Sequence, residues 1–282
     1  MATLWVVATP IGNLADLGTR AAEVLATTEV VAAESVRRTR GLLSHLGVSG
    51  RKLISCREAN RRRAAAEVVG HLDAGRDVAL VSDAGTPGVS DPAAAVVTAA
   101  VAAGHRVSPI PGPSSLAALL SVSGLARPQV LFLGFLPVKA GPRRRLLRRA
   151  AEGGWALAIF EAPHRLAATA RDLAEVVGDR PVVMAREISK LHEEVVHTTC
   201  RRLAQRAAAE PIRGEISLLV FGHSGQPQPA QDDQEVERLL RRGLAQGAEA
   251  PARLAKRVAA ECGRGKDEVY KLLMRIKQDR DG

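Results

Sequence analysis

Short runs of Val, Ile and Leu alternate with longer Ala-rich amphipathic stretches along most of the chain. Runs of this kind, bounded by Gly, Pro and Asp, predict strands, and the apolar residues at helical spacing between them predict helices. In the first half we expect strands at 4–8, 29–33, 53–55, 77–81 and 106–110. We expect helices at 17–26, 36–46, 60–74 and 92–104. The strand at 77–81 is apolar enough to be buried on both faces, so this half is predicted to be an α/β domain with a largely parallel sheet.

Two helix starts carry recognisable capping residues. Asn60 is a candidate N-cap for the helix that runs to Ala74, where Gly75 supplies the C-terminal turn. Asp91 followed by Pro92 is the pattern of an N-cap with proline at the first helical position.

The alternation resumes after a Gly- and Pro-containing boundary at 124–128. Strands are expected at 130–133, 155–160, 182–186, 194–198 and 215–221, with helices at 142–151, 163–177 and 201–209. The stretch 223–234 has almost no apolar residues and is expected to be a linker. The predicted domains are therefore 1–123, an N-terminal α/β lobe, 124–222, a second α/β lobe, and 235–282, a small helical module that resembles helix–turn–helix geometry.

Three Gly- and Pro-containing loops follow predicted strands, at 9–14, 82–92 and 111–115. The carboxyl ends of parallel strands meet at one edge of a sheet, and open α/β sheets bind their ligands there. Each loop alone is consistent with an ordinary tight turn. Their convergence, and the ten small or polar residues of the middle loop, favour a binding site built largely from backbone groups.

Several common cofactor signatures are absent from the sequence. There is no GxGxxG dinucleotide fingerprint, no GxxxxGK[ST] phosphate loop and no GxSxG nucleophile elbow. The acidic, His and Cys spacings suggest no metal centre, so no metal is expected. A small adenosyl cofactor held mainly by backbone atoms would leave such a sparse signature.

The formal net charge of +10 is concentrated in two segments. The first basic segment, 37–63, has nine basic residues and one acidic residue, and the second, 137–149, has six basic residues and no acidic one. The rest of the chain is slightly acidic. Two basic segments on an acidic body are typical of a protein that binds a polyanion such as nucleic acid, although a solvated Arg-rich surface is the alternative.

The cysteines and the lengths of the apolar stretches indicate the cellular compartment of the protein. Cys56, Cys200 and Cys262 match no disulfide or metal pattern, which favours a reducing cytosol. We expect no signal peptide, and the most apolar stretch, near 93–103, is shorter than the roughly 18–20 residues that span a bilayer. The protein is predicted to be cytoplasmic, with no membrane partner.

Seven strings along residues 4–222 together resemble the ribosomal RNA small-subunit methyltransferase I family, a branch of the tetrapyrrole methylases. They are VATPIGNL at 7–14, AAE at 32–34, ALVSDAGTPGVSDP at 79–92, PIPGPSS at 109–115, GFLP at 134–137, EAPHR at 161–165 and ARE at 185–187. The resemblance implies two α/β lobes with S-adenosylmethionine in the cleft between them, and a homodimer. It also implies 2′-O-methylation of a cytidine in the decoding region of small-subunit (16S) ribosomal RNA, free or within the 30S subunit.

The resemblance also carries site residues over to this chain. The implied cofactor contacts are Pro10, Ala84, Gly85, Thr86, Val89, Ser114, Ser115 and Glu161. The basic segments supply the expected RNA contacts, which are Arg37, Arg38, Arg40, Arg61, Arg62, Arg143, Arg144 and Arg145. A carboxylate could accept the proton of the ribose hydroxyl, and the candidates are Glu34, Asp83 and Glu187.

The chain departs from the family pattern at two places beside the first basic segment. Glu34-Ser35-Val36-Arg37 stands where the family has EDTR, and Cys56-Arg57-Glu58-Ala59-Asn60 stands where it has a His-Glu-His-Asn-like string. Two alternatives therefore stay open, a methyltransferase that acts on a tetrapyrrole and a non-catalytic RNA-binding protein. The basic segments argue against the first.

Overall fold

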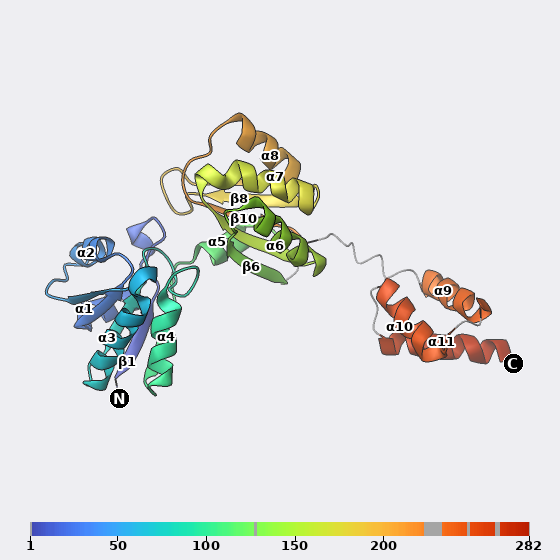
Figure 1. Ribbon diagram of the computed structural model, residues 1–282, viewed down its shortest axis with the longest axis horizontal. Helices are drawn as coiled ribbons and strands as arrows, with labels where there is room; N and C mark the ends of the chain where they lie inside the picture. The colour runs from blue at the N-terminus through green and yellow to red at the C-terminus, as the bar shows by residue number, and fades with distance from the viewer. Residues whose placement is uncertain (1, 127–128, 223–232, 247–248, 263–265, 282) are drawn as a thin grey trace. The chain divides into compact units, whose positions relative to one another are not determined.

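The structure is a computed structural model that describes residues 2–126, 129–222, 233–246, 249–262 and 266–281. The chain divides into two compact units, Met1–Phe221 and Gly222–Gly282 (Figure 1). The first unit contains two five-stranded sheets, and the second contains helices.

The first sheet is wholly parallel, as its apolar strands predict. Its strand order is β3-β2-β4-β1-β5. The strands are β1 (Thr3–Val7), β2 (Val30–Ala33), β3 (Lys52–Ser55), β4 (Val78–Val81) and β5 (Arg106–Ile110). The helices are α1 (Thr19–Thr27), α2 (Val36–His45), α3 (Arg61–Asp73), α4 (Ala93–Ala102) and α5 (Ser115–Val122). Both faces are covered: α1 and α2 pack on one face around Leu25 and Leu43, and α3 and α4 pack on the other around Val68 and Val96.

Three local expectations need correction. Asn60 occupies the N-cap position of α3, as predicted, but its side chain makes no bond to the helix: it accepts a hydrogen bond from the Arg57 N–H and donates one to the Ser55 carbonyl. Helix α4 begins one residue later than predicted, because Pro92 and not Asp91 is its N-cap; the Asp91 carboxylate accepts from the N–H groups of Gly88 and Ala93. Helix α5 was not expected, because its apolar sequence has little helical periodicity of its own.

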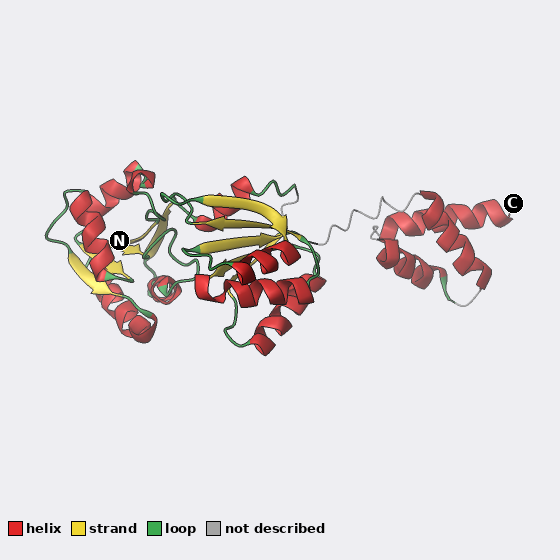
Figure 2. Ribbon diagram, turned by 90° about the horizontal axis from the view of Figure 1, so that it is seen from above, coloured by secondary structure: helices red, strands yellow, loops and turns green. Residues whose placement is uncertain are grey.

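The second sheet is mixed, with the order β6-β7-β10-β8-β9. Strands β6 and β7 are parallel, whereas β10 runs antiparallel to both β7 and β8. The strands are β6 (Val130–Phe135), β7 (Ala156–Glu161), β8 (Pro181–Arg186), β9 (Glu194–Thr199) and β10 (Ile216–Val220). The helices α6 (Ala140–Glu152), α7 (Leu166–Val176) and α8 (Cys200–Ala209) cover one face of the sheet (Figure 2). Leu119 of α5 packs on the other face.

The second unit is a bundle of α9 (Asp233–Gln246), α10 (Pro251–Cys262) and α11 (Lys266–Asp281). This unit has a separate apolar core, centred on Leu240, Leu254, Val258 and Leu273. The predicted linker at 223–234 lies, up to residue 232, outside the described residues. The α/β class with a C-terminal helical module is confirmed, whereas the boundary between the two lobes stays a prediction. No helix among the described residues combines the length and the apolar character that a membrane crossing requires.

Candidate functional site

The three predicted loops converge at one edge of the first sheet. They follow β1, β4 and β5, which are neighbours in the sheet. Thr9 and Gly85 exchange two backbone hydrogen bonds, of 2.9 and 3.0 Å. The Thr86 hydroxyl donates to the Pro113 carbonyl at 3.1 Å. The expected convergence is therefore confirmed, and the loops form one hydrogen-bonded wall.

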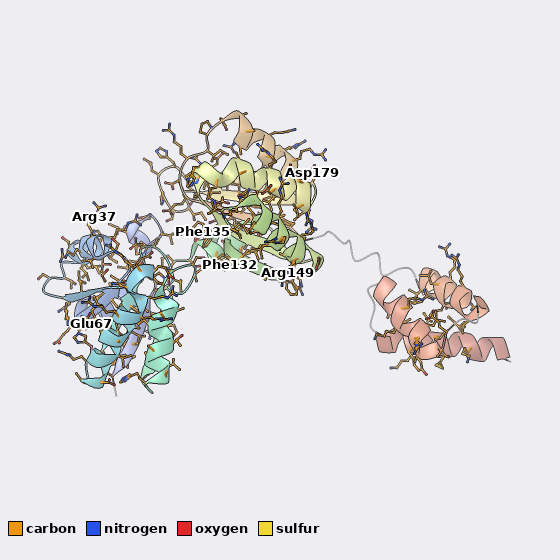
Figure 3. The ribbon with its side chains drawn as sticks, in the orientation of Figure 1. Arg37, Glu67, Phe132, Phe135, Arg149 and Asp179 are labelled. Atoms are coloured by element: carbon orange, nitrogen blue, oxygen red, sulfur yellow. The ribbon has the colours of Figure 1, made fainter. Side chains whose placement is uncertain are left out.

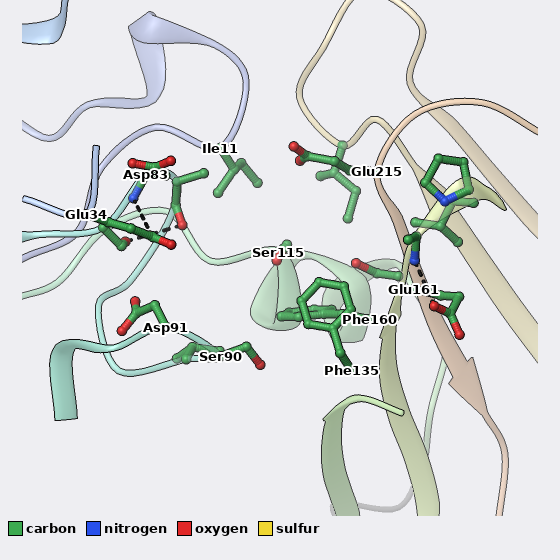
Figure 4. Close-up of a pocket in the computed structure, with 18 of the residues that line it drawn as sticks. Ile11, Glu34, Asp83, Ser90, Asp91, Ser115, Phe135, Phe160, Glu161 and Glu215 are labelled. Carbon is green, nitrogen blue, oxygen red and sulfur yellow. Dashed lines mark hydrogen bonds between the residues drawn. The ribbon is translucent and has the colours of Figure 1, made fainter. Parts of the chain in front are cut away.

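A cavity of about 430 Å³ opens beside this wall, between the loops at the carboxyl edge of the first sheet and strands of the second sheet (Figure 4). Its volume lies in the range of small-molecule sites. The residues that line it are Ile11, Glu34, Arg38, Ser82, Asp83, Ala84, Val89, Ser90, Asp91, Ser115, Phe135, Phe160, Glu161, Ala162, Pro163, Ile188, Glu215, Ile216 and Ser217.

Half of the expected cofactor contacts line this cavity. They are Ala84, Val89, Ser115 and Glu161. The other four, Pro10, Gly85, Thr86 and Ser114, do not line it.

Three of those four make contacts within the loops that account for their not facing the cavity. Gly85 has φ +80° and pairs with Thr9, and Thr86 joins two of the loops. The Ser114 hydroxyl caps α5 by accepting from the Ala117 N–H at 3.4 Å. These residues hold the wall in shape while their neighbours face the cavity.

Carboxylates gather on the wall that the first sheet contributes. Glu34 follows β2 and accepts a hydrogen bond from the Asp83 N–H at 3.3 Å, and Figure 4 shows both side chains beside Asp91. Arg38 is 3.5 Å from Asp83. The other oxygen of Asp83, Oδ1, is buried and has no hydrogen-bond partner within the described residues. A buried acceptor without a hydrogen bond is costly, and a polar ligand group that reached this atom would remove that cost.

Among the carboxylates that line the cavity, Glu34 is the one whose pKa is clearly shifted. Burial raises the pKa of Glu34, the hydrogen bond from the Asp83 N–H lowers it, and the charges of Asp83 and Asp91 raise it further. The net effect is a raised pKa, which brings this carboxylate closer to the range of a general base at neutral pH.

Glu187, the third candidate base, does not line the cavity. Its carboxylate accepts from the Glu215 N–H at 2.7 Å and pairs with Lys190 at 3.0 Å. The backbone hydrogen bond is the main reason why the pKa of Glu187 is lowered. With these partners, the Glu187 carboxylate stabilises the loop that places Ile188 at the cavity.

Glu161 also has its partners within the protein. It is buried, it accepts from the Ala162 N–H at 2.8 Å and from the Thr169 hydroxyl, and it lies 3.1 Å from Arg165. Its carboxylate is thus largely satisfied, and its part in the site is to fix the start of α7.

The far side of the cavity is aromatic. Phe135 and Phe160 line it, with ring centroids 5.9 Å apart and an edge-to-face angle of 63°. Phe132 packs on Phe160 in the same manner at 5.0 Å. Only 2% of the chain is aromatic, and three of its four Phe residues meet here. Among the described residues no cluster of His, Cys, Asp and Glu has the arrangement of a metal site.

The two basic segments differ in how many of their arginines are exposed. Arg37, Arg38, Arg40, Arg61 and Arg62 are exposed, and all come from α2 or the start of α3, at the carboxyl edge of the first sheet. On α6 the exposed arginines are Arg145, Arg148 and Arg149; Figure 3 labels Arg37 and Arg149.

The expectation that Arg143 contacts RNA is wrong. Its side chain is buried, with Nε 2.6 Å from the Asp172 carboxylate, and it donates to the Val138 carbonyl at 2.9 Å. Arg144, half-exposed, pairs with Asp172 and Glu175. The spacing of α6 places Arg143 on the apolar face with Leu147, a helical position that a charge count ignores.

Replacing Arg143 by Ala is expected to lower the free energy of unfolding by about 3–5 kcal/mol, because Asp172 loses a partner in a buried site. Denaturant unfolding of the full chain, followed by circular dichroism, measures this. Arg148→Ala, on the exposed face of the same helix, is the control and should change stability by less than about 0.5 kcal/mol. Equal stability of the two variants would contradict a structural role for Arg143.

Sequence reasoning missed several lining residues, among them Ile11, Phe135, Pro163, Ile188 and Ser217. Phe135 lies in the GFLP string and Pro163 in EAPHR, but a sequence string does not show which of its side chains faces a cavity. Only the pairing of β10 with β7 and β8 brings Ile188 and Ser217 to the site, and no local signal announces it.

The chain matches the family of tetrapyrrole (corrin/porphyrin) methylases over residues 3–204. Proteins named ribosomal RNA small subunit methyltransferase I are similar to this chain over almost its whole length. That of Neisseria meningitidis (serogroup A) is 39% identical, over 96% of this chain and 93% of that protein. That of Synechocystis is 37% identical, over 99% and 100%, and that of Pseudomonas aeruginosa is 41% identical, over 92% of each.

Solved structures share the fold at low identity. A uroporphyrin-III C-methyltransferase from Thermus thermophilus, complexed with S-adenyl homocysteine, has a TM-score of 0.55 and 22% identity, covering 78% of this chain and 97% of that one. A diphthine synthase has a TM-score of 0.61 and 13% identity, covering 79% and 90%. These similarities show the two-lobed architecture.

Proposed function

The chain belongs to the ribosomal RNA small subunit methyltransferase I family within the tetrapyrrole methylases, and from this we propose that it transfers a methyl group from S-adenosylmethionine to a cytidine ribose 2′-hydroxyl in the decoding region of 16S ribosomal RNA. The observation that carries the proposal is the similarity to relatives of that name along nearly the whole chain.

The residues of the cavity fit the proposed donor. S-adenosylmethionine supplies an activated methyl group on a sulfonium centre. The loops after β1, β4 and β5 offer small side chains and backbone groups, and Ala84, Val89 and Ser115 would contact it. The unpartnered Asp83 Oδ1 and the neighbouring Glu34 suit the cationic and hydroxyl groups of such a molecule.

Methyl transfer requires in-line positioning more than acid–base strength. The new bond joins the methyl carbon to the ribose oxygen, the bond to sulfur breaks, and its electron pair returns to sulfur. The hydroxyl proton passes to a carboxylate, for which Glu34 is the best placed: it lines the cavity and has a raised pKa. Asp83, paired with Arg38, is the second candidate.

The basic segments would bind the RNA backbone. Replacing Arg145 and Arg149 together by Ala should weaken RNA binding and reduce the slope of log K against log salt by about 1 to 2, because each phosphate contact releases counterions. Fluorescence anisotropy with 16S RNA at several salt concentrations measures the slope. The control is Arg76→Ala with Arg106→Ala, exposed residues at the amino ends of β4 and β5, the opposite edge of the first sheet. An identical slope in both double variants would show that α6 is not part of the RNA surface.

A tetrapyrrole substrate is the second candidate, favoured by the fold it shares with uroporphyrin-III C-methyltransferase. An assay with labelled S-adenosylmethionine separates the two: we expect label in small subunits from a strain that lacks the gene, and none in uroporphyrinogen. Label in the tetrapyrrole alone would overturn the proposal, and binding of RNA without transfer to either substrate would support a non-catalytic protein. The proposal includes a homodimer in the cytoplasm, and light scattering of the purified protein checks the dimer.

A further inference from the structure

Phe135 is the most exposed aromatic side chain of the described residues, at 55%. It lines the cavity, whereas the other exposed aromatics, Trp155 and Tyr270, do not. Leaving a Phe ring in water forfeits a stabilisation of roughly 1.5–3 kcal/mol. In a chain with so few aromatic residues, such a position calls for a reason beyond packing.

The backbone of β6 is distorted so that this ring faces the cavity. In a regular strand, residues three apart point to opposite faces. Phe132 and Phe135 nevertheless both pack on Phe160, because the register of β6 against β7 shifts between Phe132 and Gly134. Gly134 has φ +60°, a value that glycine adopts without strain, and a Cβ there would lie 2.9 Å from the Ser90 hydroxyl.

The backbone that follows Phe135 is anchored by two arginines. Arg165 donates to the Leu136 carbonyl at 2.5 Å, and its Nε lies 3.1 Å from the Glu161 carboxylate. Arg143 donates to the Val138 carbonyl at 2.9 Å. The ring is therefore presented to solvent from a segment that is fixed by ionic and hydrogen-bonded contacts, as a preorganised binding surface requires.

The surroundings of Phe135 indicate which ligand it meets. The chain runs from it through Val138, which is 76% exposed, directly into α6 with its exposed arginines Arg145 and Arg149. An exposed ring followed by exposed cations is the combination that proteins use to stack an unpaired base and hold its phosphates. Phe160, a partly buried residue of β7, packs edge-to-face against Phe135.

We propose that Phe135 is the stacking platform for the target nucleobase of the RNA, which it holds at the mouth of the cavity so that the ribose faces the methyl donor. This inference rests on the proposed function. It makes Phe135 a specificity-determining residue for RNA, separate from the residues that hold the donor. Figure 4 shows its ring beside that of Phe160, across the cavity from Glu34 and Asp83.

The test compares Phe135→Leu, which keeps an apolar side chain without an aromatic face, with Phe135→Trp, which keeps the face. The two readouts are kcat/KM for unmodified small subunits and calorimetric affinity for S-adenosylhomocysteine. For Phe135→Leu we expect kcat/KM to fall by about 10- to 100-fold, the effect of losing one stacked base, with donor-product affinity within about twofold of wild type. Phe135→Trp should recover most of the rate. Trp155→Leu, at an exposed aromatic outside the cavity, is the control and should match wild type.

A parallel loss of S-adenosylhomocysteine affinity in Phe135→Leu would assign the ring to the adenine of the donor and overturn the inference. So would an unchanged kcat/KM, or a Trp variant as slow as the Leu variant. The wild-type arm tests the proposed function separately: no methyl transfer to small subunits by wild-type protein would overturn that function, and this inference with it.

Discussion

Replacing Ala84 by Phe is expected to abolish donor binding while the protein stays folded. Ala84 is a small residue on the cavity side of the loop after β4, and a phenyl group there would occupy space that the donor needs. We expect S-adenosylhomocysteine affinity to fall by about 100-fold or more, because a ligand that cannot enter the cavity loses all of its contacts there together. Isothermal titration calorimetry measures the affinity.

The matched control is Ala94→Phe. Ala94 is exposed on α4 and does not line the cavity, so the same substitution adds the same surface without filling the site. It should bind S-adenosylhomocysteine as wild type does, and both variants should keep the wild-type circular dichroism spectrum. Tight binding by Ala84→Phe would show that the donor site lies elsewhere.

Replacing Glu34 by Gln should reduce methyl transfer by about 10²- to 10⁴-fold, the usual contribution of a general base, with S-adenosylhomocysteine affinity within about threefold of wild type. The substitution keeps the size of the side chain and removes its capacity to accept a proton. Single-turnover transfer to unmodified small subunits measures the chemical step.

The pH profile adds a second readout for Glu34. The active form is the carboxylate, so the wild-type rate should fall as the pH drops through the pKa of Glu34, and burial moves that fall to a higher pH than an ordinary Glu would give. In Glu34→Gln this limb should disappear. Glu29→Gln is the control: Glu29 is exposed and precedes β2, at the opposite end of the strand from Glu34. If Glu34→Gln kept both the rate and the wild-type limb, another group would be the base, with Asp83 the next to replace.

The sequence predicts the first sheet well because its signals are local. Strands β2 and β4 are short apolar runs with all four residues buried, and β4 is closely followed by Asp83, as β1 and β5 are by Pro10 and Pro111. The loops after β1, β4 and β5 follow from the same pattern, since parallel strands must present their carboxyl ends together. The Ser35 departure is also explained locally: its hydroxyl accepts from the Arg38 N–H at 3.4 Å and caps α2.

The side of the cavity that the second sheet contributes is much harder to predict. It depends on a bulge in β6 and on the antiparallel insertion of β10 between β7 and β8, which are long-range pairings. Charge counting has a similar limit, because Arg143 and Arg145 are two residues apart on α6 and yet one is buried and the other exposed. Arg143 is buried because α6 and α7 pack together around Asp172, and the composition of the segment does not indicate that packing.

In the proposed function, a donor site in the cavity serves a ribose hydroxyl of small-subunit RNA. The most direct measurement is the chemical position of the transferred methyl group. Unmodified small subunits are incubated with the protein and labelled S-adenosylmethionine, the RNA is digested to nucleosides, and the label is identified by mass spectrometry. Label in 2′-O-methylcytidine is the predicted result, and label on a base, or none in the RNA, would contradict it.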